Sequence, residues 1–261
     1  MARFCSLFSS SSGNCTYVGS SGANLLFDVG MNAKQTELAL GEIGVDPSDI
    51  DAVFITHEHT DHICGVRVFA ARYGIKIYAL PGTINAMLSM NALNDKNDFE
   101  AIGDKPVEVG GFCVRPFRTQ HDAAESCGYT MITPDSKRIS ICTDLGTVTD
   151  TVMENIYGSD LVLLESNHDV NMLRNGPYPY PLKRRILSDY GHLSNDCCAE
   201  TAVKLVEGGT TRLFLGHLSK ENNIPALALA ATKSALESAG AVENSDYLLG
   251  IAASERKITA F

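Results

Sequence analysis

Short apolar runs alternate with polar, turn-forming segments along the whole chain. The first 30 residues contain three β-rich runs, "RFCSLFS", "NCTYVGS" and "ANLLFDVG", separated by the turn-formers "SSSSGN" and "SSG". This pattern predicts a β-meander at the start of the chain. The "SSSSGN" segment is predicted to be a hairpin turn, and a loop that offers its backbone N–H groups to an anion is the alternative.

Helical periodicity first appears in "NAKQTELALGEIG", which predicts a helix that closes at Gly44. The short buried strand "DAVFI" follows, and after it come a helical pattern over "HICGVRVFAARYG" and the strand "IKIYAL". A last helix is predicted over "IPALALAATKSALESAG". Strands that alternate with helices in this way are typical of an α/β fold.

Five of the predicted strands end next to a polar side chain of a type that binds metals. These residues are His57, His121, Asp144, Glu165 and His217. Because α/β sheets carry their chemistry on the loops that leave one edge of the sheet, the repeated placement indicates a functional site. The segment from His168 to His192, "HDVNMLRNGPYPYPLKRRILSDYGH", is predicted to be a long loop.

Composition adds limits to this prediction. The chain has 261 residues, 44% of them hydrophobic, which predicts one domain over residues 1–261. It lacks both an apolar run of about 20 residues and a secretory pattern at its N-terminus, so no membrane association and a cytoplasmic location are predicted. The eight cysteines are scattered without a C-x-x-C pair, which predicts buried, reduced thiols. The net charge of -10 disfavours nonspecific nucleic-acid binding through the overall field, so a polyanion needs a local basic patch or metal ions.

The segment "THEHTDHICG" holds three of the chain's seven histidines, His57, His59 and His62, together with Asp61. At this spacing the four side chains cannot share one face of a regular helix or strand, so a bent loop is predicted. Imidazole and carboxylate suit zinc or another first-row divalent ion. Four such side chains are too many for one ion with an open position once distant partners are added, so two ions are predicted. A solvated polar loop is the alternative, and the order H-E-H excludes the H-E-x-x-H zinc-protease pattern.

Here the sequence resembles the metallo-β-lactamase superfamily, whose loop signature is H-x-H-x-D-H after a short strand. The resemblance covers essentially the whole chain and implies an α/β fold, the four-layer αββα sandwich. By position it implies three sets of ligands: His57, His59 and His121 for the first ion, Asp61, His62 and His217 for the second, and Asp144 between them. A histidine at the third position and an aspartate at the bridge are similar to the hydrolase and nuclease branches rather than to true β-lactamases.

Two further motifs, "ESNHD" and "GHLSN", resemble those of the phosphodiesterase and tRNase Z branch. In that branch a glutamate and a histidine form a charge-coupled pair near the scissile phosphate, and Glu165 and His192 resemble this pair. Leu193 departs from the Gly-His-Ser-like loop of the branch. Contact of His192 with a helix capped by Ser194 or Asn195 is the alternative reading. With "CSLFSSSSGN" and "TDLG", the motifs look most like the YycJ/WalJ group of bacterial DNA exonucleases.

The resemblance thus implies a dinuclear phosphodiesterase, a DNA exonuclease that attacks with a metal-activated hydroxide. The ligands suit Zn²⁺ or Mn²⁺, and iron fits them as well. Asp61 is predicted to orient the nucleophile, while His192, paired with Glu165, is predicted to protonate the leaving oxygen. The alternative function is a small-molecule metallo-hydrolase acting on a cyclic phosphate, a thioester or a lactone.

The 168–192 segment is also the predicted contact with nucleic acid. It has four basic residues against Asp169 and Asp189, a local excess of two positive charges, and three tyrosines are interleaved with them. Such a segment can meet a phosphate backbone and stack a base. The predicted substrate-binding residues are His168, Arg184 and Arg185, and a solvated lid with ordinary surface charge is the alternative.

Overall fold

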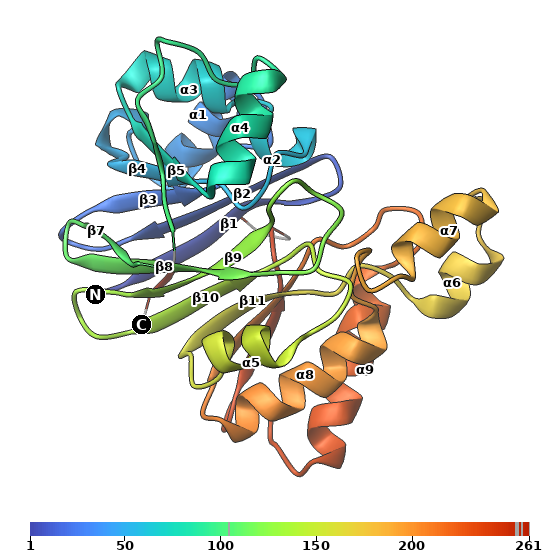
Figure 1. The fold of residues 1–261 in the computed structure, drawn as a ribbon. Helices are drawn as coiled ribbons and strands as arrows, with labels where there is room; N and C mark the ends of the chain where they lie inside the picture. Colours follow the sequence, from blue (N-terminus) through green and yellow to red (C-terminus); the bar gives the residue numbers. More distant parts are fainter. Residues whose placement is uncertain (104, 254–255, 257, 261) are drawn as a thin grey trace. The chain divides into compact units, whose positions relative to one another are not determined.

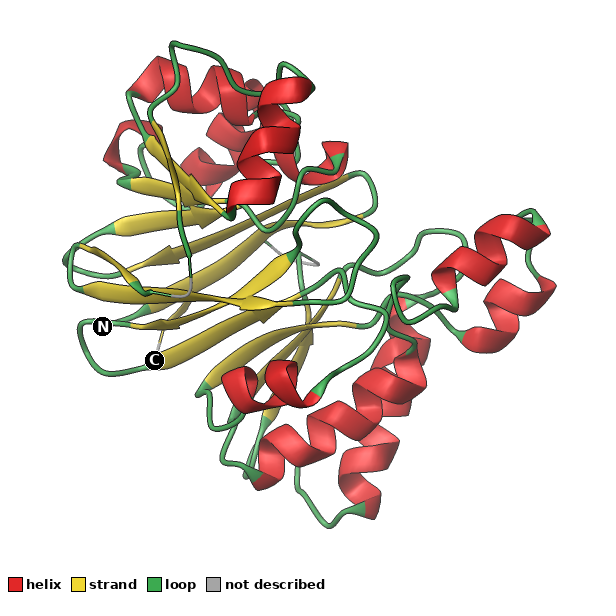
Figure 2. Cartoon of the chain, viewed as in Figure 1, coloured by secondary structure: helices red, strands yellow, loops and turns green. Residues whose placement is uncertain are grey.

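The computed structural model describes residues 1–103, 105–253, 256 and 258–260. The chain divides into two compact units (Figure 1). Unit 1 comprises Met1–Pro116, Ala123–Lys137 and Ala253–Phe261, and unit 2 comprises Phe117–Asp122 and Arg138–Ala252. Each unit combines strands with helices, as Figure 2 shows, which confirms the α/β class.

The main sheet of unit 1 is mixed. Its first strands, β1 (Arg3–Ser10), β2 (Gly13–Gly19) and β3 (Asn24–Phe27), pair antiparallel in sequence order, which confirms the β-meander and the hairpin turn. The sheet continues in parallel with β4 (Ala52–Phe54), β5 (Lys76–Ala79) and β6 (Phe99–Ala101), and β14 (Thr259–Ala260) pairs with β1. Unit 1 also contains β7 (Val107–Val109), most of β8 (Phe112–Arg118) and β9 (Cys127–Ile132).

The helices of unit 1 are α1 (Ala33–Glu42), the 3₁₀ turn η1 (Pro47–Asp49), α2 (Thr60–Ile63), α3 (Val66–Tyr73) and α4 (Pro81–Ser89). Helix α1 confirms the prediction: Asn32 caps it by accepting from the Gln35 amide, and Gly44 follows it with a φ of 72°. The helical pattern predicted over residues 62–74 is confirmed by the end of α2 and by α3, and the chain breaks between these two helices at Gly65. A Cβ there would lie 2.1 Å from the Met31 carbonyl oxygen, so the backbone passes too closely for a larger residue.

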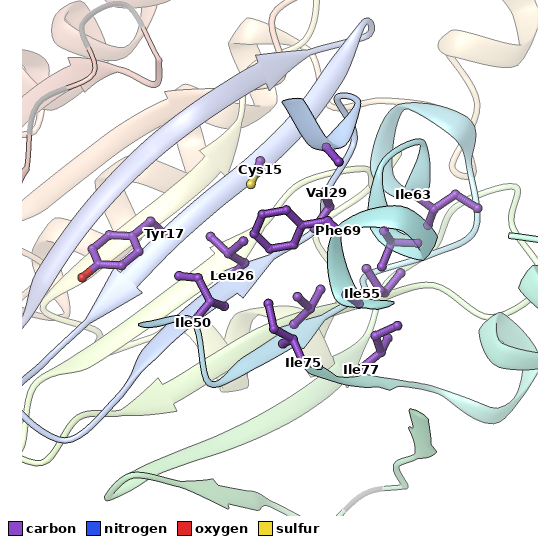
Figure 3. Packing of buried hydrophobic residues seen from close by; sticks show 14 of the residues in the cluster. Cys15, Tyr17, Leu26, Val29, Ile50, Ile55, Ile63, Phe69, Ile75 and Ile77 are labelled. Carbon is purple, nitrogen blue, oxygen red and sulfur yellow. The ribbon is translucent and has the colours of Figure 1, made fainter. Parts of the chain in front are cut away.

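An apolar core joins these helices to the sheet of unit 1. Figure 3 shows Phe69 of α3 among Leu26, Ile55 and Ile77, and all four side chains are fully buried. Burying a side chain of this size stabilises the fold by about 1.5–3 kcal/mol. The core therefore holds β3 and β4, and with them the loops that leave these two strands.

The strands of unit 2 run parallel, from β10 (Arg138–Cys142) through β11 (Leu161–Glu165) and β12 (Arg212–Gly216) to β13 (Leu248–Ile251). Its helices include α5 (Asp150–Ile156), α8 (Asn195–Glu207) and α9 (Pro225–Ser238). Ser194 caps α8 by accepting from the Cys197 amide, so of the two caps named in the alternative reading of His192 it is Ser194 that is present. Because parallel strands end at the same edge, the residues after β10, β11 and β12 meet there.

The long loop predicted over residues 168–192 was wrong, because the segment contains α6 (Val170–Asn175) and α7 (Tyr180–Ile186). Asp169 caps α6 by accepting from the Met172 amide. The Lys183 ammonium group donates to the carbonyl oxygens of Arg174 and Gly176 and so fastens α7 to the end of α6. The prolines and tyrosines of the segment favoured the prediction of a loop, and the helix cap at Asp169 was not recognised.

All eight cysteines are free thiols, as predicted. Five of them are buried, whereas Cys113 is half-buried and Cys64 and Cys197 are exposed, so burial was predicted correctly only in part. Among the described residues, none of the helices combines the length and the apolar character needed to cross a membrane.

Candidate metal centre and active site

The histidine loop of unit 1, residues 57–62, follows β4 and turns through α2. His57 and His62 are buried, whereas His59 and Asp61 are half-buried. The ring centroid of His57 lies 4.5 Å from that of His59 and 4.1 Å from that of His62. An oxygen of Asp61 lies 3.6 Å from Nε2 of His62. The loop thus brings the three predicted imidazoles and the predicted carboxylate together.

A buried carboxylate that sequence analysis missed, Asp28, orients two of these rings. Its Oδ2 lies 2.8 Å from Nδ1 of His62 and accepts from the Thr56 hydroxyl at 2.9 Å. The same hydroxyl lies 3.0 Å from Nδ1 of His57. In the tautomer that satisfies both contacts, Nδ1 carries the proton and Nε2 the lone pair, which is the form that binds metals. Asp28 directly follows β3, so the rule applied to the other strand ends could have found it.

Asn14 is a second residue that sequence analysis missed. Its Nδ2 lies 3.0 Å from Nε2 of His62 and 3.2 Å from Oδ2 of Asp61. The side chain is itself held by Ser10, whose amide donates to Oδ1 and whose carbonyl accepts from Nδ2. The "SSSSGN" hairpin therefore ends in an amide that contacts the histidine loop.

In unit 2 the fully buried carboxylate of Glu165 is the centre of a second cluster. Its Oε1 accepts from Nδ1 of His192 and from Nδ1 of His217, both at 2.8 Å, while Oε2 accepts from the Leu145 and Leu193 amides. Burial alone would raise the pKa of Glu165, but the charges and hydrogen bonds of the two histidines outweigh it and lower the pKa to about 2. The predicted contact between Glu165 and His192 is present, and the contact with His217 was not predicted.

Asp144 and His121 lie at the same edge of unit 2. Oδ1 of Asp144 is 3.3 Å from Nδ1 of His217 and 3.9 Å from Nε2 of His121. Asp144 and His217 have φ angles of 59° and 53°, a left-handed backbone that non-glycine residues rarely adopt and that clusters at functional sites.

The side chains of this cluster fit a divalent ion. Asp144, Glu165, His192 and His217 each offer a nitrogen or oxygen within 4.8 Å of the others. Imidazoles and carboxylates are ligands for zinc, manganese and iron. Together with the histidine loop of unit 1, this cluster indicates binding of divalent metal.

The three predicted substrate-binding residues differ in their surroundings. His168 is 1% exposed, and neither of its ring nitrogens has a hydrogen-bond partner among the described residues. Its burial lowers the pKa of the imidazole to about 4. Arg185 is half-exposed and forms a two-bond ion pair with Asp122, one bond of which, Nη2 to Oδ1, is 3.0 Å long. Arg184 is exposed. The substrate-binding role of the three residues stays a prediction.

Known proteins resemble this chain over most of its length. The sequence profile of the metallo-beta-lactamase superfamily matches residues 10–217. Exodeoxyribonuclease WalJ of Streptococcus pneumoniae serotype 2 is 41% identical over 231 residues, which cover 87% of this chain and 85% of WalJ. Exodeoxyribonuclease YycJ of Bacillus anthracis is 38% identical over 240 residues, which cover 91% of this chain and 90% of YycJ.

Solved structures share the fold at low sequence identity. The metallo-beta-lactamase fold protein YhfI of Bacillus subtilis has a TM-score of 0.72 at 18% identity, with 96% of both chains covered. The short form of human tRNase Z has a TM-score of 0.66 at 16% identity, with 99% of this chain and 98% of the other covered. At these identities the likeness shows the fold alone, which is the α/β sandwich that the sequence predicted. The chain belongs to the metallo-beta-lactamase superfamily, in the group that contains WalJ and YycJ.

Proposed function

We propose that the chain is a divalent-metal-dependent exodeoxyribonuclease that hydrolyses phosphodiester bonds. The names of WalJ and YycJ, which are 41% and 38% identical to it over most of their lengths, support this activity. The observation that carries the proposal is the hydrogen bond from His192 to the buried Glu165 carboxylate, within the cluster that also contains Asp144 and His217. This arrangement combines a metal-binding cluster with a candidate proton donor, which hydrolysis of a phosphodiester requires.

The proposed cofactor is a pair of divalent ions, Zn²⁺ or Mn²⁺, with iron also suited to the donor set. The proposed ligands are His57, His59, Asp61, His62, His121, Asp144 and His217. When bound, such ions would activate water at neutral pH and neutralise the charge of the phosphate.

In the proposed reaction, Asp61 orients the attacking water and His192 donates a proton to the leaving oxygen. The side chain of Asp61 is 25% exposed beside His62, so its carboxylate can accept a hydrogen bond from the attacking water. In its protonated form His192 donates from Nδ1 to the buried Glu165 carboxylate, which stabilises the imidazolium charge, and its second proton, on Nε2, is the one passed to the leaving oxygen. The His192 side chain is 18% exposed, so a substrate can reach it.

The proposed contact with the nucleic-acid backbone lies on α7. Arg184 is exposed there, and Tyr180 of the same helix is 73% exposed. An arginine that meets a phosphate and a tyrosine that stacks a base are the usual elements of single-strand binding. Because Arg185 is engaged by Asp122, we assign the larger share of phosphate binding to Arg184.

The test compares two leaving groups. End-labelled duplex DNA and bis(p-nitrophenyl) phosphate are given to the wild type and to His192→Ala with added Mn²⁺ or Zn²⁺. A deoxyribose oxygen must be protonated as it leaves, whereas p-nitrophenolate departs as an anion. The variant should therefore hydrolyse DNA about 10²–10⁴-fold more slowly, the usual share of a general acid, and lose less than about tenfold on the nitrophenyl ester. Cys197→Ala, which changes an exposed side chain of α8, is the control.

Two outcomes would count against the proposal in different ways. A wild type that hydrolyses no DNA with either metal would overturn the nuclease function. If that enzyme instead turned over a cyclic phosphate, a thioester or a lactone, the small-molecule alternative would stand. Equal losses on both substrates in His192→Ala would remove the proton-donor role and leave the nuclease function intact.

A further inference from the structure

A buried asparagine follows three of the four side chains in the Glu165 cluster. The pairs are Glu165 with Asn167, His192 with Asn195, and His217 with Asn223. The asparagine side chains are 3–5% exposed. They belong to the motifs "ESNHD", "GHLSN" and "GHLSKENN", whose asparagines have no role in the proposed chemistry.

The side chains of Asn195 and Asn223 form a reciprocal amide pair. Nδ2 of Asn195 donates to Oδ1 of Asn223 at 2.9 Å, and Nδ2 of Asn223 donates to Oδ1 of Asn195 at 2.8 Å. The same Nδ2 of Asn223 lies 2.9 and 3.1 Å from the backbone carbonyl oxygens of Ser166 and Asn167, which share its second hydrogen. The Ser166 hydroxyl donates to Oδ1 of Asn195 at 2.8 Å. The loop after β11, the first residue of α8 and the loop after β12 are thus tied to one another.

Asn167 connects this network to the histidines. Its Nδ2 donates to the carbonyl oxygen of His217 at 2.8 Å, which holds that residue in its left-handed conformation. The backbone N–H of Asn167 donates to the carbonyl oxygen of Leu193, the residue directly after His192, at 2.9 Å. The backbone carbonyl oxygen of Asn167 accepts from the backbone N–H of Ser219 at 2.8 Å. One asparagine therefore fixes the backbone beside both histidines.

Energetics favour a network that is complete. Fixing the backbone of a loop costs conformational entropy, so three loops need specific bonds to stay in register. A buried amide left without its partner is unfavourable, because it has lost its contact with water and gained no hydrogen bond in return. Hydrogen bonds are also directional, and they specify a loop conformation more sharply than apolar contacts do.

We propose that Asn167, Asn195 and Asn223, with Ser166, form a positioning network that sets His192 and His217. The inference rests on the proposed function, in which these histidines are the proton donor and a metal ligand. Because the asparagines carry no charge, their loss changes the field at a bound cation little. Any change in metal affinity therefore reports placement of the histidines.

The experiment measures metal binding rather than turnover. Full-length wild type, Asn167→Ala and Asn223→Ala are stripped with a chelator and titrated with Zn²⁺ or Mn²⁺ alone. The dissociation constant should rise by about tenfold or more, since the loss of an outer partner of a metal-binding histidine weakens binding 10–100-fold. Asn97→Ala is the matched control, because Asn97 lies in unit 1, is 7% exposed and donates its Nδ2 to the Arg67 carbonyl at 3.0 Å.

Thermal unfolding of the same variants separates positioning from general stability. All three should melt below the wild type, but only the two variants of unit 2 should bind metal more weakly. The proposal is overturned if all three melt earlier and keep the wild-type dissociation constant. Asn167→Ala removes one side-chain hydrogen bond and keeps the test informative if Asn223→Ala does not fold. DNA hydrolysis by the wild type is measured in parallel, so that failure of the nuclease function is seen separately.

Discussion

The histidine loop of unit 1 and the Glu165 cluster of unit 2 collect the same kinds of side chain by different routes. In the loop, the whole set comes from residues 57–62, which run from the end of β4 into α2, so one local bend is enough to gather it. In the Glu165 cluster, His192 lies 27 residues from Glu165 along the chain, and His217 lies 52 residues from it. The first cluster needs only a local bend, whereas the second needs three separate loops to be held in place.

Both clusters nevertheless use one buried carboxylate to orient two histidines. Asp28 contacts His62 directly and reaches His57 through the Thr56 hydroxyl, while Glu165 contacts both of its histidines directly. The difference lies in the support around the carboxylate. Chain connectivity holds the loop together, and closing a short segment costs little entropy. The Glu165 cluster, whose residues are far apart in the sequence, has the buried asparagine network in addition.

The largest effect is expected from His57→Ala, which removes the first imidazole of the histidine loop. Loss of an outer partner of a ligand costs 10–100-fold, so loss of the imidazole itself should lower kcat/KM about 10³-fold. Hydrolysis of bis(p-nitrophenyl) phosphate with saturating Mn²⁺ measures it. Cys64→Ala, an exposed change next to the same loop, should behave like the wild type. Wild-type activity in His57→Ala would remove the loop from the metal centre.

The next largest effects are expected from changes to the two buried carboxylates, Asp28 and Glu165. Asp28→Asn and Glu165→Gln each remove a negative charge that accepts hydrogen bonds from histidine, so both should weaken metal binding within the 10–100-fold range. We expect Asp28→Asn near tenfold, because the chain still holds its histidines together, and Glu165→Gln near a hundredfold. Titration of the chelator-treated variants with Zn²⁺ gives both values. The opposite order would refute the view that connectivity supports the histidine loop.

A smaller effect concerns the stability of unit 2 in mild acid. His168 has an ordinary pKa of 6.5, which burial lowers to about 4 in the fold, so the unfolded chain takes up this proton first. Stability from neutral His168 is complete above pH 6.5 and is lost as the pH falls from 6.5 towards 4, with about 2 kcal/mol gone at pH 5. His168→Leu should reduce the difference between the free energies of unfolding at pH 7 and pH 5 by that amount. Urea unfolding of metal-free protein measures it, and an unchanged difference would contradict the assignment.

The smallest effect is expected at α7. Arg184→Ala removes an exposed cation, so it should weaken DNA binding only a few-fold at physiological salt and lower the salt slope by about one. Fluorescence anisotropy with an end-labelled DNA at several salt concentrations gives the slope. Lys34→Ala removes an exposed charge of α1 in unit 1 and serves as the control. Equal slopes for the two variants would favour the reading of this segment as a solvated surface.

Patterns that lie within a few residues were readable from the amino-acid order. The strands that end at His57, Asp144 and His217, the crowded histidine loop and the Ser194 cap are all of this kind, because a local run of side chains specifies them. The contact of Glu165 with His192 followed from resemblance to a family, in which motif order stands in for distance.

Contacts between segments that are far apart in the sequence could be identified only in the folded structure. Asp28 beneath the histidine loop, the second histidine on Glu165, the Asn195–Asn223 pair and the engagement of Arg185 by Asp122 each join groups far apart in sequence. Many donors and acceptors along the chain are chemically equivalent. Which of them meet depends on strand order and loop path, since a hydrogen bond forms only between groups that the packed core has already brought within about 3 Å.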